Sequence, residues 1–409
     1  MREYLITILI AAGTTYLLVG PVASIARRIG AAPPTRDRDV HRAPVPRLGG
    51  LAMLGGLLAA MLVASFLPRM GLVFEGSSDA RALLTSAAVI CLIGAADDIW
   101  ELPALTKLAG QLFAAGLLVV QGVQLIWLPL PTGGTFSLDP AQGALLTILL
   151  VVATANAINF IDGLDGLAAG VVGIGAAAVF TYVYALTVAG DLTRLTMPAL
   201  VTAIICGVCL GFLPHNVHPA KVFMGDSGAL LLGLLLASGT ITLTGRFPAQ
   251  GELEPSFLLA MLPLLIPVAV IAIPLTDMLL AVFRRTGEGR SPFTPDKSHL
   301  HHQLLELGHS HGRAVLIMWS WTALIGFGVV LVGRFNGWTT WVGLGVAVGV
   351  ALLITLRPAG RERPDDQVSN SGENDEVAHL IVNGNDQVGK SGSDGEVSHL
   401  ITESAEDRP

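Results

Sequence analysis

The sequence predicts an all-α, polytopic integral membrane protein, and three observations support this fold class. Of the 409 residues, 52% are hydrophobic and only 13% are charged, whereas soluble domains carry about 25% charged residues. Apolar runs recur along the chain, each near the roughly 20 residues that a helix needs to cross a bilayer. Lys and Arg gather in alternate connections between these runs, as the positive-inside rule describes.

About eleven of these runs are candidate transmembrane helices. They cover residues 4–26, 48–67, 82–96, 105–125, 142–160, 167–189, 197–213, 229–244, 257–283, 315–332 and 338–356. The first run is long for a signal peptide, and Arg27 and Arg28 follow it in place of a small-residue cleavage site. We therefore expect the first run to remain as a membrane anchor.

The distribution of basic residues predicts the orientation. The connection 27–47 holds six arginines, and the connection 284–313 holds five Lys and Arg residues. Because cytoplasmic connections retain such charges, we expect the N-terminus outside and the C-terminus in the cytoplasm. The protein would be a multi-pass protein of the plasma membrane, with its active site on the cytoplasmic face.

Residues 358–409 differ in composition from the rest of the chain. They hold 12 acidic and four basic residues, and a segment so poor in apolar residues cannot offset the entropy lost on ordering. We expect residues 1–357 to form the transmembrane domain and 358–409 to form a disordered, acidic cytoplasmic tail. Segment 376–381 recurs as 396–401 with one letter changed, which leaves open a recognition peptide or a neutral duplication. We expect no nucleic-acid partner.

Polar groups that are costly near a membrane gather in four segments. These are 97–98, 156–165, 216–226 and 290–302. The default interpretation of such groups is functional. With the orientation above, all four lie on the cytoplasmic side, so we expect them to converge on one site. The three cysteines lie inside apolar runs, and we interpret them as packing residues.

Asp97 and Asp98 close the third apolar run. Mg²⁺ takes oxygen ligands and is usually bound by one or two carboxylates together with waters and substrate phosphates. Two acids at the C-terminal end of a helix are unfavourable against the helix macrodipole, so we expect another group to hold them there. A solvated helix end is the structural alternative.

The stretch from Asn156 to Asp165 carries polar residues at a spacing of three. On a helix, Asn156, Asn159 and Asp162 would share one face. The two glycines that follow are expected to end that helix and to let the backbone approach a ligand. The letters Asp-Gly-Leu-Asp-Gly also occur in the CDP-alcohol phosphotransferase signature, but the arginine and the further aspartates of that signature are absent, which excludes that family. Tying helices together is the structural alternative.

Asn216 precedes a Gly-Asp-Ser-Gly motif. Two glycines flank Asp226, so we expect a tight turn that presents one carboxylate to an ion or a phosphate. The motif alone is weak evidence. Together with the two preceding motifs it becomes strong evidence for a phosphate or metal site.

The segment 290–302 is rich in Arg and His. Its side chains of interest are Arg290, His299, His301 and His302. They are donors that match phosphate oxygens, and Arg can bind these bidentately. The histidines could instead bind zinc, but no catalytic zinc motif such as H-E-x-x-H accompanies them. We expect His309 and His311 to be plain loop residues.

Together these motifs resemble those of the polyprenyl-phosphate N-acetylhexosamine-1-phosphate transferases, the family that includes MraY and WecA. The similarity covers residues 36–311, and the matching motifs are 96–98, 156–170, 223–228 and 290–302. The last of these looks like the WecA branch, whereas the MraY branch, which hands on a MurNAc-pentapeptide, carries a different histidine loop. The whole is similar to actinobacterial decaprenyl-phosphate GlcNAc-1-phosphate transferases.

The resemblance implies a reaction, a cofactor and partners. The enzyme would transfer GlcNAc-1-phosphate from UDP-GlcNAc to a polyprenyl phosphate, with decaprenyl phosphate expected, and would release UMP. This is the first membrane step of cell-envelope polysaccharide synthesis. The resemblance also implies Mg²⁺, for which Mn²⁺ could substitute, bound by Asp226 and Asn159. The bilayer and the two substrates would be its partners, and a homodimer is left open.

The resemblance also implies individual roles. Lys107 would meet the diphosphate, and Asn216 and Phe223 would hold the uracil. Asp97 and Asp98 would deprotonate or orient the lipid phosphate, while the Arg and His side chains of 290–302 would contact the sugar and the phosphates. The expected catalytic residues are Asp97, Asp98, Asp226, His301 and His302. The expected substrate-binding residues are Lys107, Asn156, Asp162, Asp165, Asn216, Phe223, Arg290 and His299.

Alternative interpretations come from other functional classes. In a transporter, Asp97, Asp162 and Asp226 would form a cation or proton relay, although transporter sites tend to lie near the bilayer midplane. A scaffold that binds partners through its acidic tail would leave the four motifs without a role. For the transferase, the lipid phosphate could attack directly or through an aspartyl-phosphate, and direct attack is our hypothesis.

Overall fold

Helices supply nearly all of the regular structure in the computed structural model, which describes residues 1–32, 44–75, 78–129, 135–190, 196–246, 286, 309–335 and 337–357. The helices are α1 (Arg2–Arg28), α2 (Gly49–Ser65), α3 (Asp79–Trp100), α4 (Ala104–Val120), α5 (Pro140–Ile161), α6 (Leu167–Gly190), α7 (Thr196–Asn216), α8 (Gly225–Arg246), α11 (His311–Arg334) and α12 (Trp338–Leu356). A short 3-10 helix, η1 (Gly71–Val73), and two strands, β1 (Trp127–Pro129) and β2 (Thr135–Ser137), complete the described elements.

The apolar composition explains the choice of helices. In lipid, every backbone N–H and C=O must find a partner within the protein, and a helix supplies these partners along its own length. Eight of the described helices are long and apolar enough to cross a membrane, while α2 and α4 are shorter, at 17 residues each. The predicted polytopic helical fold is therefore confirmed.

Each predicted run except 257–283 overlaps a described helix. The run 257–283 and the predicted tail, 358–409, lie outside the described residues. The total of eleven spans, the orientation and the disorder of the tail consequently stay predictions.

The predicted run 105–125 is too long at its C-terminal end. Helix α4 ends at Val120, and Gly122 adopts a left-handed backbone with φ of 96° that turns the chain. The strands β1 and β2 then pair antiparallel, with Trp127 opposite Ser137. These strands have three residues each, which is too short for an alternating pattern to distinguish them from the end of an apolar helix.

Helix α5 begins at a capping box. The side chain of Asp139 accepts hydrogen bonds from the backbone N–H groups of Ala141 and Gln142, and the side chain of Gln142 accepts one from the Asp139 backbone. Pro140 occupies the first helical position, where its missing N–H costs nothing. This firm start sets the register of a helix whose far end carries Asn156 and Asn159.

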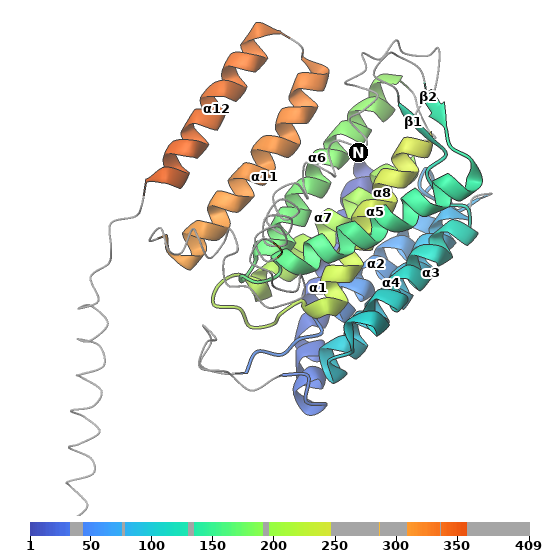
Figure 1. Cartoon of the computed structure of the whole chain (residues 1–409), viewed down its shortest axis with the longest axis vertical. Helices are drawn as coiled ribbons and strands as arrows, with labels where there is room; N and C mark the ends of the chain where they lie inside the picture. The colour runs from blue at the N-terminus through green and yellow to red at the C-terminus, as the bar shows by residue number, and fades with distance from the viewer. Residues whose placement is uncertain are drawn as a thin grey trace, which may run out of the picture. The chain divides into compact units, whose positions relative to one another are not determined.

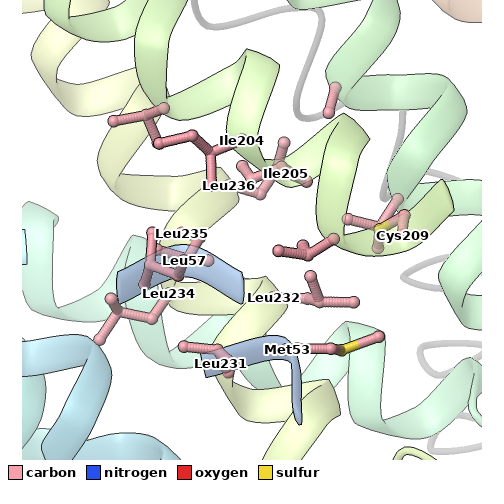
Figure 2. Close-up of a cluster of buried hydrophobic side chains, with 14 of the residues drawn as sticks. Met53, Leu57, Ile204, Ile205, Cys209, Leu231, Leu232, Leu234, Leu235 and Leu236 are labelled. Carbon is pink, nitrogen blue, oxygen red and sulfur yellow. The ribbon is translucent and has the colours of Figure 1, made fainter. Parts of the chain in front are cut away.

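The centre of the described bundle is formed by α7 and α8. Most residues of α7 are buried, and α8 contacts α2, α3, α5 and α7. Figure 2 shows the cluster where α2, α7 and α8 meet, with Met53 and Leu57 among Ile204, Cys209 and the leucines of α8. A helix that is apolar on all sides, as α8 is, belongs inside a bundle. The buried position of Cys209 fits the predicted packing role.

Consecutive helices from α1 to α8 run in opposite directions (Figure 1). The C-terminal ends of α3, α5 and α7 therefore lie on the same side of the bundle as the N-terminal ends of α2, α4 and α8. The ends of α3 and α4 are joined by a connection of three residues, 101–103. The polar segments 97–98, 156–165 and 216–226 all fall at this end of the helices.

Candidate functional site

Lys107 connects three helices at this end of the bundle. It lies in the first turn of α4, and its Nζ is 2.7 Å from Oδ2 of Asp97 in the last turn of α3. The same Nζ forms an ion pair with Oδ2 of Asp226 in the first turn of α8. One ammonium group between two carboxylates offsets their mutual repulsion. The structure thus brings together three predicted site residues, although Lys107 and Asp226 are 119 positions apart in the sequence.

Asp98 holds the start of α8. It is buried, with 7% of its surface exposed. Its Oδ1 accepts a hydrogen bond of 2.9 Å from the backbone N–H of Asp226, and its Oδ2 accepts one of 3.1 Å from the N–H of Ser227. A helix lacks internal acceptors for these first N–H groups, and the positive end of its dipole attracts an anion. The expectation that other groups hold the acidic pair is therefore confirmed, since Lys107 binds Asp97 and α8 binds Asp98.

Helix α8 begins at Gly225, so Asp226 lies in the first turn of a helix. The predicted tight turn around Asp226 is wrong, because the backbone of α8 already continues through the Gly-Asp-Ser-Gly motif. Gly225 has a left-handed φ of 67°, and a methyl group there would lie 2.4 Å from Oδ2 of Asp98. A methyl group on Gly94 would lie 2.6 Å from the Asp226 backbone. Both glycines let α3 approach α8 closely enough for Asp98 to reach it.

The end of α5 contributes two asparagines. The side chain of Asn159, in the last turn of α5, lies beside the carboxylate of Asp226. Asn156 instead donates to the side chain of Gln111 on α4 and to the carbonyl of Val152, 2.8 Å away. Asn159 is therefore positioned beside Asp226, while Asn156 is engaged in joining α5 to α4.

Asp162 lies just beyond α5, which ends at Ile161. The predicted helical face shared by all three polar residues is therefore wrong for Asp162, since the chain leaves the helix before the following glycine. Burial raises the pKa of Asp162 to about 8, and the negative charges of Asp226 and Asp98 add to this effect. The positive charge of Arg47 opposes the rise. The carboxyl group of Asp162 therefore holds its proton more tightly than that of an ordinary aspartic acid.

Asp226 and Asn159 are the described residues best suited to hold a magnesium ion. Each side chain can offer an oxygen ligand, and Mg²⁺ selects such hard oxygen ligands while keeping several waters or phosphate oxygens. The nearby Asp97 adds a further carboxylate. The donor set therefore fits the predicted ion, and the metal assignment itself stays a prediction.

A second cluster joins Asp165, His218 and His311. Oδ2 of Asp165 lies 2.7 Å from Nδ1 of His218, and the backbone N–H of Asp165 donates to Nε2 of His311 over 3.1 Å. The two imidazole rings stack with centroids 4.4 Å apart. Their ligand atoms are close enough to hold a metal ion, but one nitrogen of each ring is already engaged by the carboxylate or the backbone N–H of Asp165. We interpret the cluster as a hydrogen-bonded junction.

His311 is the first residue of α11, so its predicted loop position is wrong. His309 remains outside the helix, where its Nε2 lies 2.9 Å from the carbonyl of Thr355 on α12. The sequence offers no signal for either contact, because both partners are reached across the fold. The junction at His311 fixes the start of α11 against the turn that follows α5.

Asn216 is buried at the end of α7, and both ends of its amide are engaged. Its Oδ1 accepts a hydrogen bond of 3.1 Å from the backbone N–H of Gly166, and its Nδ2 donates to the carbonyl of Val222 over 3.0 Å. Asn216 therefore shapes the turn that leads to the partly buried Phe223. The predicted contacts of Asn216 and Phe223 with uracil stay predictions. The predicted residues Arg290, His299, His301 and His302 lie outside the described residues.

Three residues of the site are missing from the sequence-based prediction. Gln111 pairs with Asn156, His218 pairs with Asp165, and Arg47 acts electrostatically on Asp162. Gln111 is a polar residue in the middle of an apolar run, a signal that could have indicated a buried partner. His218 and Arg47 lie in connections, where one sequence cannot distinguish site residues from solvated ones.

Comparison with known proteins decides the family. Residues 80–244 match the family model described as glycosyl transferase family 4. A decaprenyl-phosphate N-acetylglucosaminephosphotransferase of Mycolicibacterium smegmatis is 45% identical over 370 residues, which cover 89% of this chain and 91% of that protein. The chain belongs to glycosyl transferase family 4.

Other members of the family differ in their distance from this chain. A protein of Mycobacterium tuberculosis with the same description is 46% identical over 374 residues, covering 89% of this chain and 92% of that protein. A phospho-N-acetylmuramoyl-pentapeptide-transferase of Desulforudis audaxviator is 32% identical over 351 residues, which cover 77% of this chain and 95% of that protein. The predicted resemblance to the GlcNAc-phosphate branch of the family is therefore confirmed.

Proposed function

We propose that the protein transfers GlcNAc-1-phosphate from UDP-GlcNAc to a polyprenyl phosphate, decaprenyl phosphate being the expected acceptor, with release of UMP. The observation that carries the proposal is the junction of Asp97, Lys107 and Asp226 at one end of the membrane helices. This junction occurs in a chain that is 45% identical, over 89% of its length, to a relative named for this reaction. The product would be the first membrane-bound intermediate of a cell-envelope polysaccharide.

The reaction joins two anions, and the residues of the site suit that task. An oxygen of the lipid phosphate attacks the β-phosphorus of the donor, a new P–O bond forms, and the bond to UMP breaks. A phosphate monoester is already largely ionised at neutral pH, since its second pKa is about 6. Asp97 would therefore orient the acceptor, and Lys107 would exchange a carboxylate partner for a diphosphate oxygen.

Mg²⁺ is the cofactor that we propose, with Mn²⁺ as a substitute, held by Asp226 and Asn159. When bound, it would neutralise charge on the diphosphate and favour the in-line displacement. Asp98 contributes by fixing the first turn of α8, which aims Asp226. The direct route predicts that no phosphorylated protein forms when UDP-GlcNAc is supplied without acceptor, and a trapped aspartyl-phosphate would overturn it.

We place the site on the cytoplasmic face. The support is the concentration of Lys and Arg in the connections 27–47 and 284–313, which the predicted topology puts on the same side as the polar segments. Single cysteines introduced at exposed positions near Arg28 and near Arg81, in a background without native cysteines, test this. A membrane-impermeant maleimide added to intact cells should label only the second position.

The decisive experiment is a reaction with purified components. Full-length protein in detergent is incubated with Mg²⁺, decaprenyl phosphate and a panel of UDP-sugars, and the released UMP is measured. We expect release with UDP-GlcNAc, and none after Asp226→Ala. Wild-type turnover in Asp226→Ala would refute the metal assignment, and no UMP from any UDP-sugar would refute the function. The transporter alternative loses support because the carboxylates lie at helix ends and not midway along them.

A further inference from the structure

Arg47 is held beside the site by the backbone on both sides of it. The carbonyl of Pro46 accepts a hydrogen bond of 3.0 Å from the N–H of Phe223. In return, the N–H of Gly49 donates to the carbonyl of Phe223 over 3.1 Å. Because the segment that begins with Phe223 leads directly to Asp226, the position of Arg47 is tied to that of the predicted metal ligand.

The start of α2 cannot easily move away from this place. Leu48 has a left-handed φ of 81° and is 1% exposed, which shows that the surrounding structure enforces its conformation. A methyl group on Gly50 would lie only 2.1 Å from the backbone nitrogen of Gly228, so α2 and α8 are in backbone contact. The backbone N–H of Arg47 itself donates to the carbonyl of Ala31 over 2.9 Å.

The positive charge of Arg47 is close enough to the site to act on Asp162. The pKa of Asp162 is raised by burial and by the charge of Asp226, and Arg47 opposes this rise without reversing it. Lys107 is already bound by Asp97 and Asp226. By contrast, Arg47 forms no ion pair with a carboxylate in the part of the chain that the structure describes.

The surroundings of Arg47 call for an anionic ligand. Its side chain is partly buried, and a guanidinium carries five N–H donors that need acceptors. The carboxylates at this end of the bundle would repel a nucleotide diphosphate. A guanidinium near them would supply both charge and two parallel donors, which match phosphate oxygens.

We propose that Arg47 binds the diphosphate of the nucleotide-sugar donor. The inference rests on the proposed function and adds a substrate contact to it. The donor is favoured over the lipid phosphate because the backbone on both sides of Arg47 is bonded to Phe223, a residue expected to hold uracil. Arg47 would then span the distance between the base and the metal ligand Asp226, which is where the two phosphates of UDP must lie.

Binding of UDP and of uridine to the full-length protein tests the proposal. Isothermal titration in detergent with Mg²⁺ compares wild type with Arg47→Gln and Arg47→Lys. A charge-assisted hydrogen bond is worth enough to change a dissociation constant by about ten- to one-hundred-fold. We expect Arg47→Gln to weaken the binding of UDP by about that factor and the binding of uridine by less than about twofold. Arg47→Lys should recover part of the affinity, since it keeps the charge and loses the paired donors.

Arg28→Gln is the matched control, because Arg28 is an exposed arginine in the last turn of α1. It should leave UDP binding unchanged. Equal UDP affinity in wild type and Arg47→Gln, at unchanged thermal stability, would overturn the inference. An equal loss of affinity for UDP and for uridine would also overturn it, as would a rise confined to the KM for decaprenyl phosphate. If Arg47→Gln does not fold, the UDP affinity of Arg47→Lys, which keeps the aliphatic stem, is compared with that of the wild type instead.

The two proposals can fail separately. A wild-type protein that binds UDP but releases no UMP from any donor would refute the proposed function. In that case the UDP titration of the Arg47 variants still decides whether Arg47 binds a diphosphate. Active wild type with an unaffected Arg47→Gln would refute only the role of Arg47.

Discussion

Replacing Asp98 with asparagine should destabilise the protein, because the two carboxylate oxygens bind two backbone N–H groups of α8. Asparagine has one acceptor oxygen, so it keeps one of the hydrogen bonds, at 2.9 or 3.1 Å. Its NH₂ group then faces the other N–H. A buried N–H without an acceptor costs about 1–3 kcal/mol. Losing the negative charge at the helix N-terminus costs about 0.3–1 kcal/mol more.

The expected loss is therefore about 1–4 kcal/mol in the free energy of unfolding, from these two effects. Reversible unfolding in mixed detergent micelles, followed by far-UV circular dichroism, measures it. Glu101→Gln is the control, because it removes one carboxylate just beyond the same end of α3 from an exposed position. Such a surface change should alter the free energy by less than about 0.5 kcal/mol.

Turnover of the Asp98→Asn variant separates positioning from chemistry. If Asp98 acts by holding α8, then activity and stability should fall together, and a lower assay temperature should restore part of the activity. An unchanged free energy of unfolding with complete loss of UMP release would refute this reasoning. Asp98 would then act directly on the lipid phosphate.

Three other changes have distinct expected outcomes. Gly225→Ala should lower the thermal unfolding midpoint, because the left-handed backbone costs an L-residue about 1–2 kcal/mol and the methyl group would overlap Asp98. The control, Gly343→Ala, places its methyl group in open space on α12 and should leave the midpoint unchanged. In EDTA, stability should fall as pH rises from about 4 to about 8, because the pKa of Asp162 is raised from 3.8 to about 8 and its ionised form is disfavoured in the fold. Asp162→Asn should flatten that pH profile, and an unchanged slope would show that other groups set it. Deleting residues 365–409 should leave UMP release intact, and its loss would favour the scaffold alternative.

The helices could be predicted because lipid leaves the chain few choices. An apolar run bounded by polar residues must form a helix or be buried otherwise, and Asp97, Asp98 and Asp226 stand out at the ends of such runs. Helix ends are harder to predict. Asp226 flanked by glycines resembles a turn, but the carboxylate of Asp98 caps the N–H groups there and lets α8 start at Gly225. That cap depends on a contact that no local pattern contains.

The site could be predicted in part for the same reason. Carboxylates and amides near a membrane indicate function, but not which of them face a substrate. Asn156 and Asn216 are engaged by protein groups, while Asn159 faces Asp226. These residues have the same chemistry in the sequence, and only the packing of α4, α5 and α7 distinguishes them.

The bond between Asp98 and α8 links the fold to the order of synthesis. The two partners are 128 positions apart in the chain, and a ribosome adds about 5–20 residues per second, so α8 emerges roughly 6–25 s after Asp98. During that interval the carboxylate has no helix to cap, and Asp226 does not yet exist. The reacting end of the bundle is therefore assembled late in biogenesis, so a nascent chain halted before Gly225 would enter the membrane without it.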